Sequence, residues 1–67
     1  MATSEFRVIG MKDEQCLRLV MNAIQDLPGI DHAEVSLDTG EAVIEHGPLV
    51  SEGDVRAAVE EAGYATA

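Results

Sequence analysis

The sequence predicts one α+β domain, in which two helices cover one face of a four-stranded antiparallel sheet. Two observations support this fold class. Some segments alternate apolar and polar residues, which is typical of half-buried strands, and others repeat apolar residues every three or four positions, which is typical of helices. These segments follow in the order strand, helix, strand, strand, helix, strand. The 67 residues are enough for a single domain, residues 1–67, with a small core.

The first strand is predicted over residues 5–9, where apolar and polar residues alternate. Gly10 ends this strand. Asp13 is a suitable N-cap for the helix that follows, and Pro28 with Gly29 stops that helix. The apolar face of the helix consists of residues spaced three and four apart: Leu17, Val20, Ile24 and Leu27.

A hairpin is predicted after the first helix. Residues 30–37 alternate again once a slip near Asp31 is allowed, and residues 41–46 follow as a strand that pairs back on them. The turn between the two strands, residues 38–40, ends in a glycine, which can adopt positive φ.

The second helix is predicted to begin after Ser51, which forms a capping-box pattern with Asp54. Gly63 is a natural terminating glycine, and residues 64–66 leave room for a short last strand. The buried face of this helix is formed by Val55, Ala58, Val59 and Ala62. The complete order of elements is that of the ferredoxin-like βαββαβ sandwich.

The charge of the chain limits its partners. Thirteen acidic and four basic residues give a formal net charge of −9, which repels nucleic acids and anionic membrane surfaces. We therefore expect no nucleic-acid partner. A cation or a basic protein surface suits this field, although an acidic surface can also serve solubility alone.

The cellular compartment is predicted to be the cytoplasm. A single cysteine cannot form an intramolecular disulfide, and the N-terminus lacks the pattern of a signal peptide. No apolar segment approaches the ~20 residues of a membrane-spanning helix, so we expect no direct membrane insertion.

The candidate functional residues lie at the start of the first helix. Cys16, the only thiol, is predicted in its first turn, three residues after Asp13. Free backbone N–H groups and a partial positive charge at this position favour the thiolate, which is the form that binds metal ions. Two alternatives stay open: Asp13 can be a ligand or only a helix cap, and Cys16 can be a ligand or a small buried apolar residue.

The chain resembles the heavy-metal-associated domain family, which includes copper chaperones and the amino-terminal domains of metal-pumping ATPases. The resemblance extends over nearly the whole chain. It is carried by Phe6-x-Val8-x-Gly10-Met11, by Val20-x-x-Ala23-Ile24-x-x-Leu27-Pro28-Gly29-Ile30 and by Ala62-Gly63-Tyr64.

The family's metal site is Met-x-Cys-x-x-Cys, and this chain matches it from Met11 to Cys16 with Asp13 in place of the first cysteine. The resemblance implies Cu(I) as the ion. The carboxylate and thiolate pair instead favours Zn²⁺, Co²⁺ or Ni²⁺, because a hard oxygen suits Cu(I) poorly. Met11 is expected to support the loop from below, with a role as a thioether ligand as the alternative. Tyr64 is expected at the same end of the sheet as Cys16, either to shield the metal site or form a hydrogen bond near it, or only to close the edge of the core. His32 and His46 are predicted at the opposite end of the sheet, as exposed residues outside the site.

The resemblance implies a module that binds a transition-metal ion and transfers it, as a metallochaperone or as the cytosolic domain of a metal-transporting ATPase. Its partner would be such an ATPase or another metal-binding domain. The alternative is a protein-interaction or regulatory module of the same fold whose metal site has decayed. An enzyme is not expected, because no base is predicted near Cys16. Two molecules could also share one metal ion through Cys16 and Asp13 of each, giving a metal-bridged homodimer.

Overall fold

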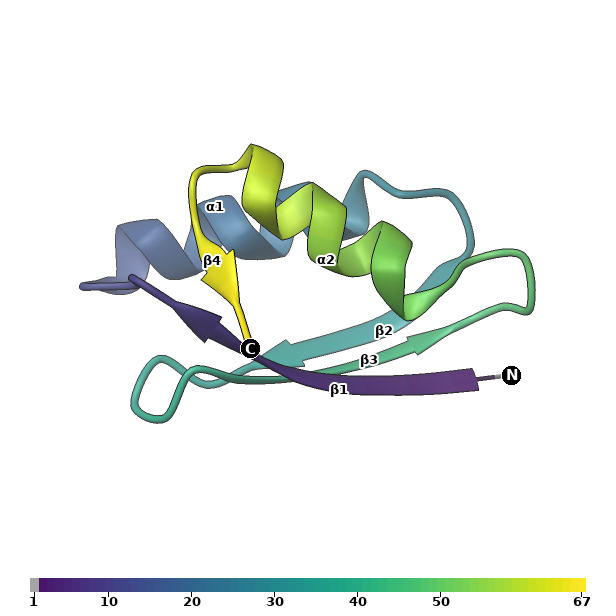
Figure 1. Cartoon of the computed structure of the whole chain (residues 1–67), viewed down its shortest axis with the longest axis horizontal. Coiled ribbons are helices and arrows are strands. Elements are labelled where there is room, and N and C mark those ends of the chain that lie inside the picture. Colours follow the sequence, from purple (N-terminus) through teal and green to yellow (C-terminus); the bar gives the residue numbers. More distant parts are fainter. Residues whose placement is uncertain (1) are drawn as a thin grey trace.

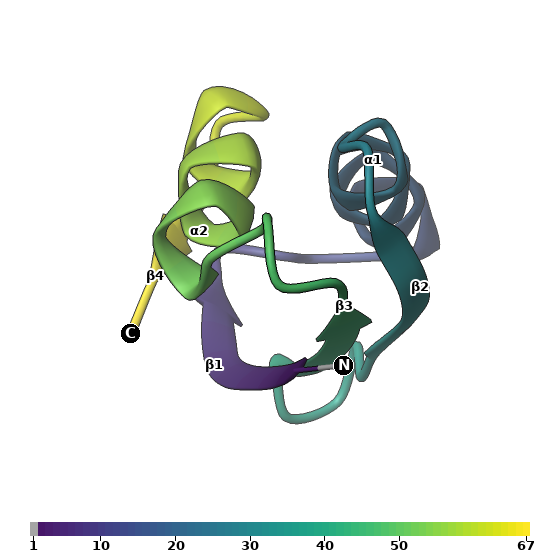
Figure 2. The same ribbon diagram turned by 90° about the vertical axis from the view of Figure 1, so that its right-hand side faces the viewer.

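The computed structural model describes residues 2–67 and confirms the predicted fold class. Four antiparallel strands form one sheet in the order β2-β3-β1-β4, and both helices lie on the same side of it (Figures 1 and 2). The elements are β1 (Ala2–Ile9), α1 (Glu14–Gln25), β2 (Ile30–Val35), β3 (Glu41–His46), α2 (Glu52–Glu61) and β4 (Ala65–Thr66). No helix within residues 2–67 is long and apolar enough to cross a membrane.

Strand β1 begins three residues earlier than the alternation predicted. Residues 2–4 contain no large apolar residue, so the pattern of the sequence could not show that they pair with the end of β3. In the structure Ala2 lies opposite His46, and the buried Ser4 lies opposite Ile44. Strand β1, one of the two inner strands, is therefore paired along its whole length, with β3 over residues 2–7 and with β4 over residues 8–9.

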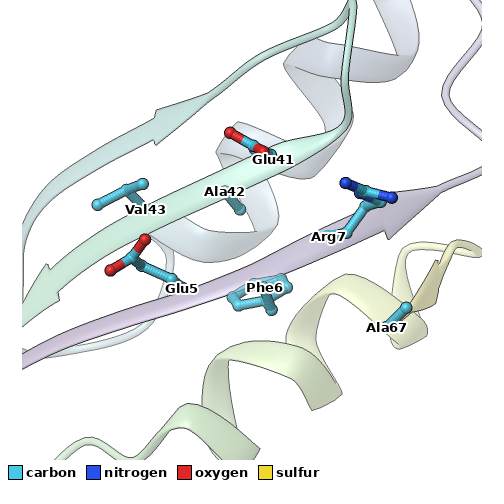
Figure 3. Close-up of a pocket in the computed structure, with 7 residues that line it drawn as sticks. All are labelled: Glu5, Phe6, Arg7, Glu41, Ala42, Val43 and Ala67. Atoms are coloured by element: carbon cyan, nitrogen blue, oxygen red, sulfur yellow. The ribbon is translucent and has the colours of Figure 1, made fainter.

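The two faces of the sheet differ as the alternation predicted. Phe6 is buried on the helix side. Figure 3 shows Glu5 and Arg7 of β1 beside Val43 and Glu41 of β3 on the outer face, and Arg7 lies directly opposite Glu41 in the register. Cross-strand pairs of opposite charge favour this register.

The β2–β3 hairpin contains the predicted slip, which is a register shift between Ile30 and His32. At the other end of the hairpin, Gly40 has a φ of +78°, and an added Cβ would lie 2.5 Å from the carbonyl oxygen of Val8. The backbone N–H of Val8 donates to the carbonyl of Gly40 over 2.7 Å. Only glycine satisfies both the backbone conformation and this close approach.

The core between the helices and the sheet is aliphatic apart from one aromatic ring. Both helices are capped as predicted: the Asp13 side chain caps α1, and Ser51 and Asp54 form a complete capping box on α2. The buried apolar residues are Phe6, Val8, Val20, Ile24, Ala33, Ala42, Ile44, Val55 and Val59. The predicted helix faces therefore supply the centre of the core, with Leu17 and Leu27 at its margin.

Truncation of Ile44, whose side chain is fully buried, tests this core. We expect Ile44→Ala to lower the free energy of unfolding by about 2–5 kcal/mol, because the lost contacts leave a cavity that a small sheet cannot close. Leu19→Ala is the matched control, since Leu19 is 50% exposed. Chemical denaturation measures both, and equal losses in the two variants would contradict the assigned core.

Candidate metal site

The candidate site lies in the loop that connects β1 to α1. Gly10 leaves β1 with a φ of +106°, which turns the chain toward the start of the helix. A Cβ at Gly10 would lie 3.6 Å from a ring carbon of Tyr64, so the segment after α2 closes over this loop. Figure 1 shows the start of α1 and the segment between α2 and β4 on the same side of the molecule. Residues far apart in sequence therefore meet at this loop.

Asp13 caps the helix and faces Cys16. Its backbone is extended, with a φ of −153°, and its Oδ1 accepts the backbone N–H of Cys16 over 3.0 Å. This hydrogen bond, and a second one with the Cys16 side chain, hold the pKa of the Asp13 carboxyl below its ordinary value. The carboxylate is therefore ionised at neutral pH and lies next to the thiol.

Cys16 is half-buried, and the pKa of its thiol is lowered. The main cause is hydrogen bonding from the Tyr64 side chain, followed by the backbone N–H of Lys12. Burial and the side chain of Asp13 raise the same pKa, but less strongly than these groups lower it. The predicted direction is confirmed, while the leading cause is a tyrosine from the other end of the sequence.

Tyr64 packs at the edge of the core and also reaches the candidate site. Its ring packs against the hydrophobic core. Its hydroxyl interacts with Cys16, which raises the pKa of the phenol. The order of the elements placed Tyr64 at this end of the sheet, but its contact with the thiol depends on how the segment after α2 packs beside the first loop.

Replacing Tyr64 tests its effect on the thiol. We expect Tyr64→Phe to raise the pKa of Cys16, because the ring remains while the hydrogen-bond donor is lost. At a pH near that pKa the variant then holds less thiolate and is alkylated more slowly by iodoacetamide. The control is Thr66→Val, which removes a neighbouring hydroxyl that bonds Glu60 instead. Identical pH profiles of alkylation for wild type and Tyr64→Phe would remove Tyr64 from the site.

The other residues near the loop either pack against the core or are exposed to solvent. Met11 is partly buried and packs against the core, under the loop. Lys12 and Glu14 are exposed, and Glu14 supplies a favourable negative charge in the first helical turn. The exposed Leu19 lies off the apolar face of α1, as its spacing indicates.

The two histidines lie away from the loop, but only one of them is exposed. The His32 side chain is 57% exposed and forms an ion pair with Glu34 at 3.2 Å when it is protonated. The prediction that His46 is exposed was wrong, since it is 3% exposed. Its Nδ1 donates to the carbonyl of Gly47 over 3.0 Å, and its Nε2 lies 2.8 Å from the Ser4 hydroxyl.

The burial of His46 has a signal in the sequence. Ala42, Ile44 and His46 are spaced two apart, so they point to the same face of β3. The polarity of the histidine favours exposure, whereas its position in this series favours burial. Its two hydrogen bonds explain why a polar ring is tolerated there.

The number of ligands in the site is small. Within residues 2–67 no three or more side chains of His, Cys, Asp or Glu gather so that they could hold a metal ion. The loop thus brings together one carboxylate and one thiol. A metal ion bound here would complete its coordination with ligands from outside the chain.

The fold and this loop define a class of small βαββαβ domains that carry a cysteine at the start of the first helix. The comparison with known proteins identifies the particular family. The chain belongs to the heavy-metal-associated domain family, whose sequence pattern matches residues 5–65.

Similar proteins include a separate chaperone and parts of much larger pumps. Copper chaperone CopZ of Staphylococcus saprophyticus is 32% identical over 65 residues, which cover 96% of each chain. Copper-transporting ATPase RAN1 of Arabidopsis thaliana is 33% identical over 61 residues, 90% of this chain and 6% of the ATPase. The crystal structure of a copper binding domain from HMA7, a P-type ATPase, superimposes with a TM-score of 0.95 at 29% identity, over 100% of this chain and 92% of that one. The chain therefore spans only a small part of the ATPase that it matches.

Proposed function

We propose that this domain binds a transition-metal ion and transfers it, with Cys16 as the principal ligand and Asp13 as the second. The observation that carries this proposal is the pair itself: a half-buried thiol whose pKa is lowered, next to an ionised carboxylate that accepts the backbone N–H of the same residue. Family membership supports the same role. No catalysed reaction is proposed, because transfer of the metal ion requires only that one ligand replaces another.

The pair of ligands determines which ions fit. One oxygen and one sulfur suit the borderline ions Zn²⁺, Co²⁺ and Ni²⁺, whereas Cu(I) prefers two soft ligands. Cu(I) can still bind here if a partner supplies the second thiolate. We propose that the isolated domain prefers the divalent ions and that a soft ion is shared with a partner's cysteine.

The proposed partner is a metal-transporting ATPase or another metal-binding domain in the cytoplasm. The names of the similar proteins, a copper chaperone and copper-transporting ATPases, support this class of partner. A second copy of this chain could supply the same missing ligands, which would give a metal-bridged homodimer with two Cys16 and two Asp13 ligands. Sedimentation at saturating metal tests the dimer, which a purely monomeric protein would exclude.

A second candidate function is an interaction module that has lost its metal site. The observation in its favour is that the hydrogen bond from the backbone N–H of Cys16 explains Asp13 as a helix cap without any metal. The lowered pKa of the thiol, which remains partly accessible, favours metal binding instead.

Binding of Co²⁺ distinguishes the two functions. We expect the reduced protein to develop the thiolate-to-cobalt charge-transfer absorption as the ion is added, and Zn²⁺ to displace it. Because the ligand is the deprotonated Cys16, binding releases a proton and strengthens as the pH rises toward the pKa of the thiol. If this absorption does not appear at any pH, and Cu(I) does not bind stoichiometrically either, the metal-binding function is wrong and the interaction module is favoured.

A further inference from the structure

An apolar groove lies at the end of the molecule opposite Cys16. We call it the Leu49 groove, and its volume is about 450 Å³. Its apolar lining comes from the α1–β2 connection, the β3–α2 loop and α2: Leu27, Pro28, Leu49, Val50, Ala57 and Ala58. The α1–β2 and β3–α2 connections lie at the right-hand end in Figure 1, and Figure 2 looks onto that end. The groove is therefore separate from the metal loop.

The walls of the Leu49 groove are held in place. The backbone N–H of Gly47 donates to the carbonyl of Gly29 over 2.9 Å, which ties the two loops together. Gly29 also approaches Val50 so closely that an added Cβ would lie 3.0 Å from the Val50 side chain. Leu49, beside this contact, is 97% exposed. A single exposed leucine is ordinary, but Leu49 adds to the apolar lining of a groove whose walls are fixed by these contacts.

The charges around the Leu49 groove are negative. Asp54 and Glu61 contribute carboxylates to its lining, and no lysine, arginine or histidine contributes to it. The last turn of α1, which ends beside the groove, carries no basic residue to offset the partial negative charge of a helix C-terminus. The N-terminus of α2, which has a partial positive charge, also lies here. Its N-cap backbone N–H, that of Ser51, already donates to the Asp54 carboxylate in the capping box.

We propose that the Leu49 groove docks a protein segment that carries one or two large apolar side chains flanked by lysine or arginine. The apolar side chains enter the groove, and the cations face Asp54 and Glu61. A second copy of this chain fits poorly, because two molecules of charge −9 repel each other and the chain has only four basic residues. This proposal is independent of metal binding at Cys16.

Synthetic peptides test the proposal directly. The probe is an acetylated, amidated peptide in which leucine and phenylalanine are separated by lysines. Two matched peptides replace the lysines by glutamates or the apolar residues by serines. We expect the first peptide alone to give saturable backbone amide shifts in the α1–β2 connection, in the β3–α2 loop and at the groove residues of α2.

Single substitutions locate the contact. We expect Leu49→Ser to weaken binding of the first peptide roughly tenfold through lost apolar contact, and Glu61→Lys to weaken it several-fold at low salt. Leu19→Ser is the control, because this exposed leucine lies on α1 outside the groove. Amide spectra of each variant verify that the fold is intact.

Four results would overturn the proposal. These are equal binding of the glutamate peptide, shifts confined to residues 10–16, no saturable shift with any peptide, and no effect of Leu49→Ser. Separately, if the amide shifts of the groove residues depended on protein concentration without any peptide, the groove would bind a second copy of the chain and the proposal would be wrong.

Discussion

Replacement of Asp13 by cysteine is expected to increase affinity for Cu(I) by on the order of a hundredfold or more. The variant holds two thiolates in the loop where the wild type holds one thiolate and one carboxylate, and soft Cu(I) binds thiolates far better than oxygen. The preference of the domain should therefore shift from Zn²⁺ and Co²⁺ to Cu(I). Competition with a Cu(I)-specific chromophoric chelator measures the change.

Asp13→Ser separates ligation from capping. Serine is a good N-cap, so this variant keeps the bond to the backbone N–H of Cys16 and loses only the carboxylate. If Asp13 is a ligand, Asp13→Ser weakens Zn²⁺ and Co²⁺ binding while the unfolding temperature changes little. Zn²⁺ and Co²⁺ binding by Asp13→Ser as tight as that of the wild type would mean that Asp13 is a cap alone.

Replacement of Cys16 by serine is expected to abolish stoichiometric binding of every transition-metal ion at the loop. A neutral hydroxyl is a poor ligand, and the remaining carboxylate cannot hold an ion by itself. Because Cys16 is only half-buried and lies in the first turn of α1, the fold should survive the change. Calorimetric titration of the reduced protein with Zn²⁺ measures the loss.

The matched control for Cys16→Ser is His32→Ala, which removes an exposed potential ligand at the opposite end of the sheet. Retained binding in the control and lost binding in Cys16→Ser would locate the site. The assignment fails if Cys16→Ser binds Zn²⁺ as tightly as wild type, or if His32→Ala is the variant that loses binding.

The sequence predicted the fold well because its local signals agree with one another. The apolar spacing on both helices, the caps at Asp13 and Ser51 and the glycine after the hairpin turn each point to the same βαββαβ order. The register slip near Asp31 was visible for the same reason. These features depend on neighbours within a few residues.

Features set by distant residues were not predictable in this way. The first three residues of β1 are strand because they pair with β3, and nothing in their own composition indicates it. The contact of Tyr64 with Cys16 joins residues 48 positions apart. Only the structure shows that this contact is the main cause of the lowered thiol pKa. The spacing in β3 did place His46 on the inner face, but its partners there, Ser4 and Gly47, are set by the packing and not by the sequence around it.

The role of Asp13 connects the fold to the proposed function. The residue is well explained as a helix cap, and the same geometry leaves its carboxylate beside the thiol. A cap that also serves as a ligand would couple metal binding to the start of α1. Metal binding should then protect the first-turn amides of α1 from hydrogen exchange more than those of its last turn.

The most direct test of the central claim is an anaerobic titration of the reduced protein with Cu(I), Zn²⁺, Co²⁺ and Ni²⁺, followed through backbone amide shifts. The proposal predicts saturable shifts confined to residues 11–17 and Tyr64, with the divalent ions binding more tightly than Cu(I). Shifts centred on His32, or no saturable shifts with any of the four ions, would contradict it.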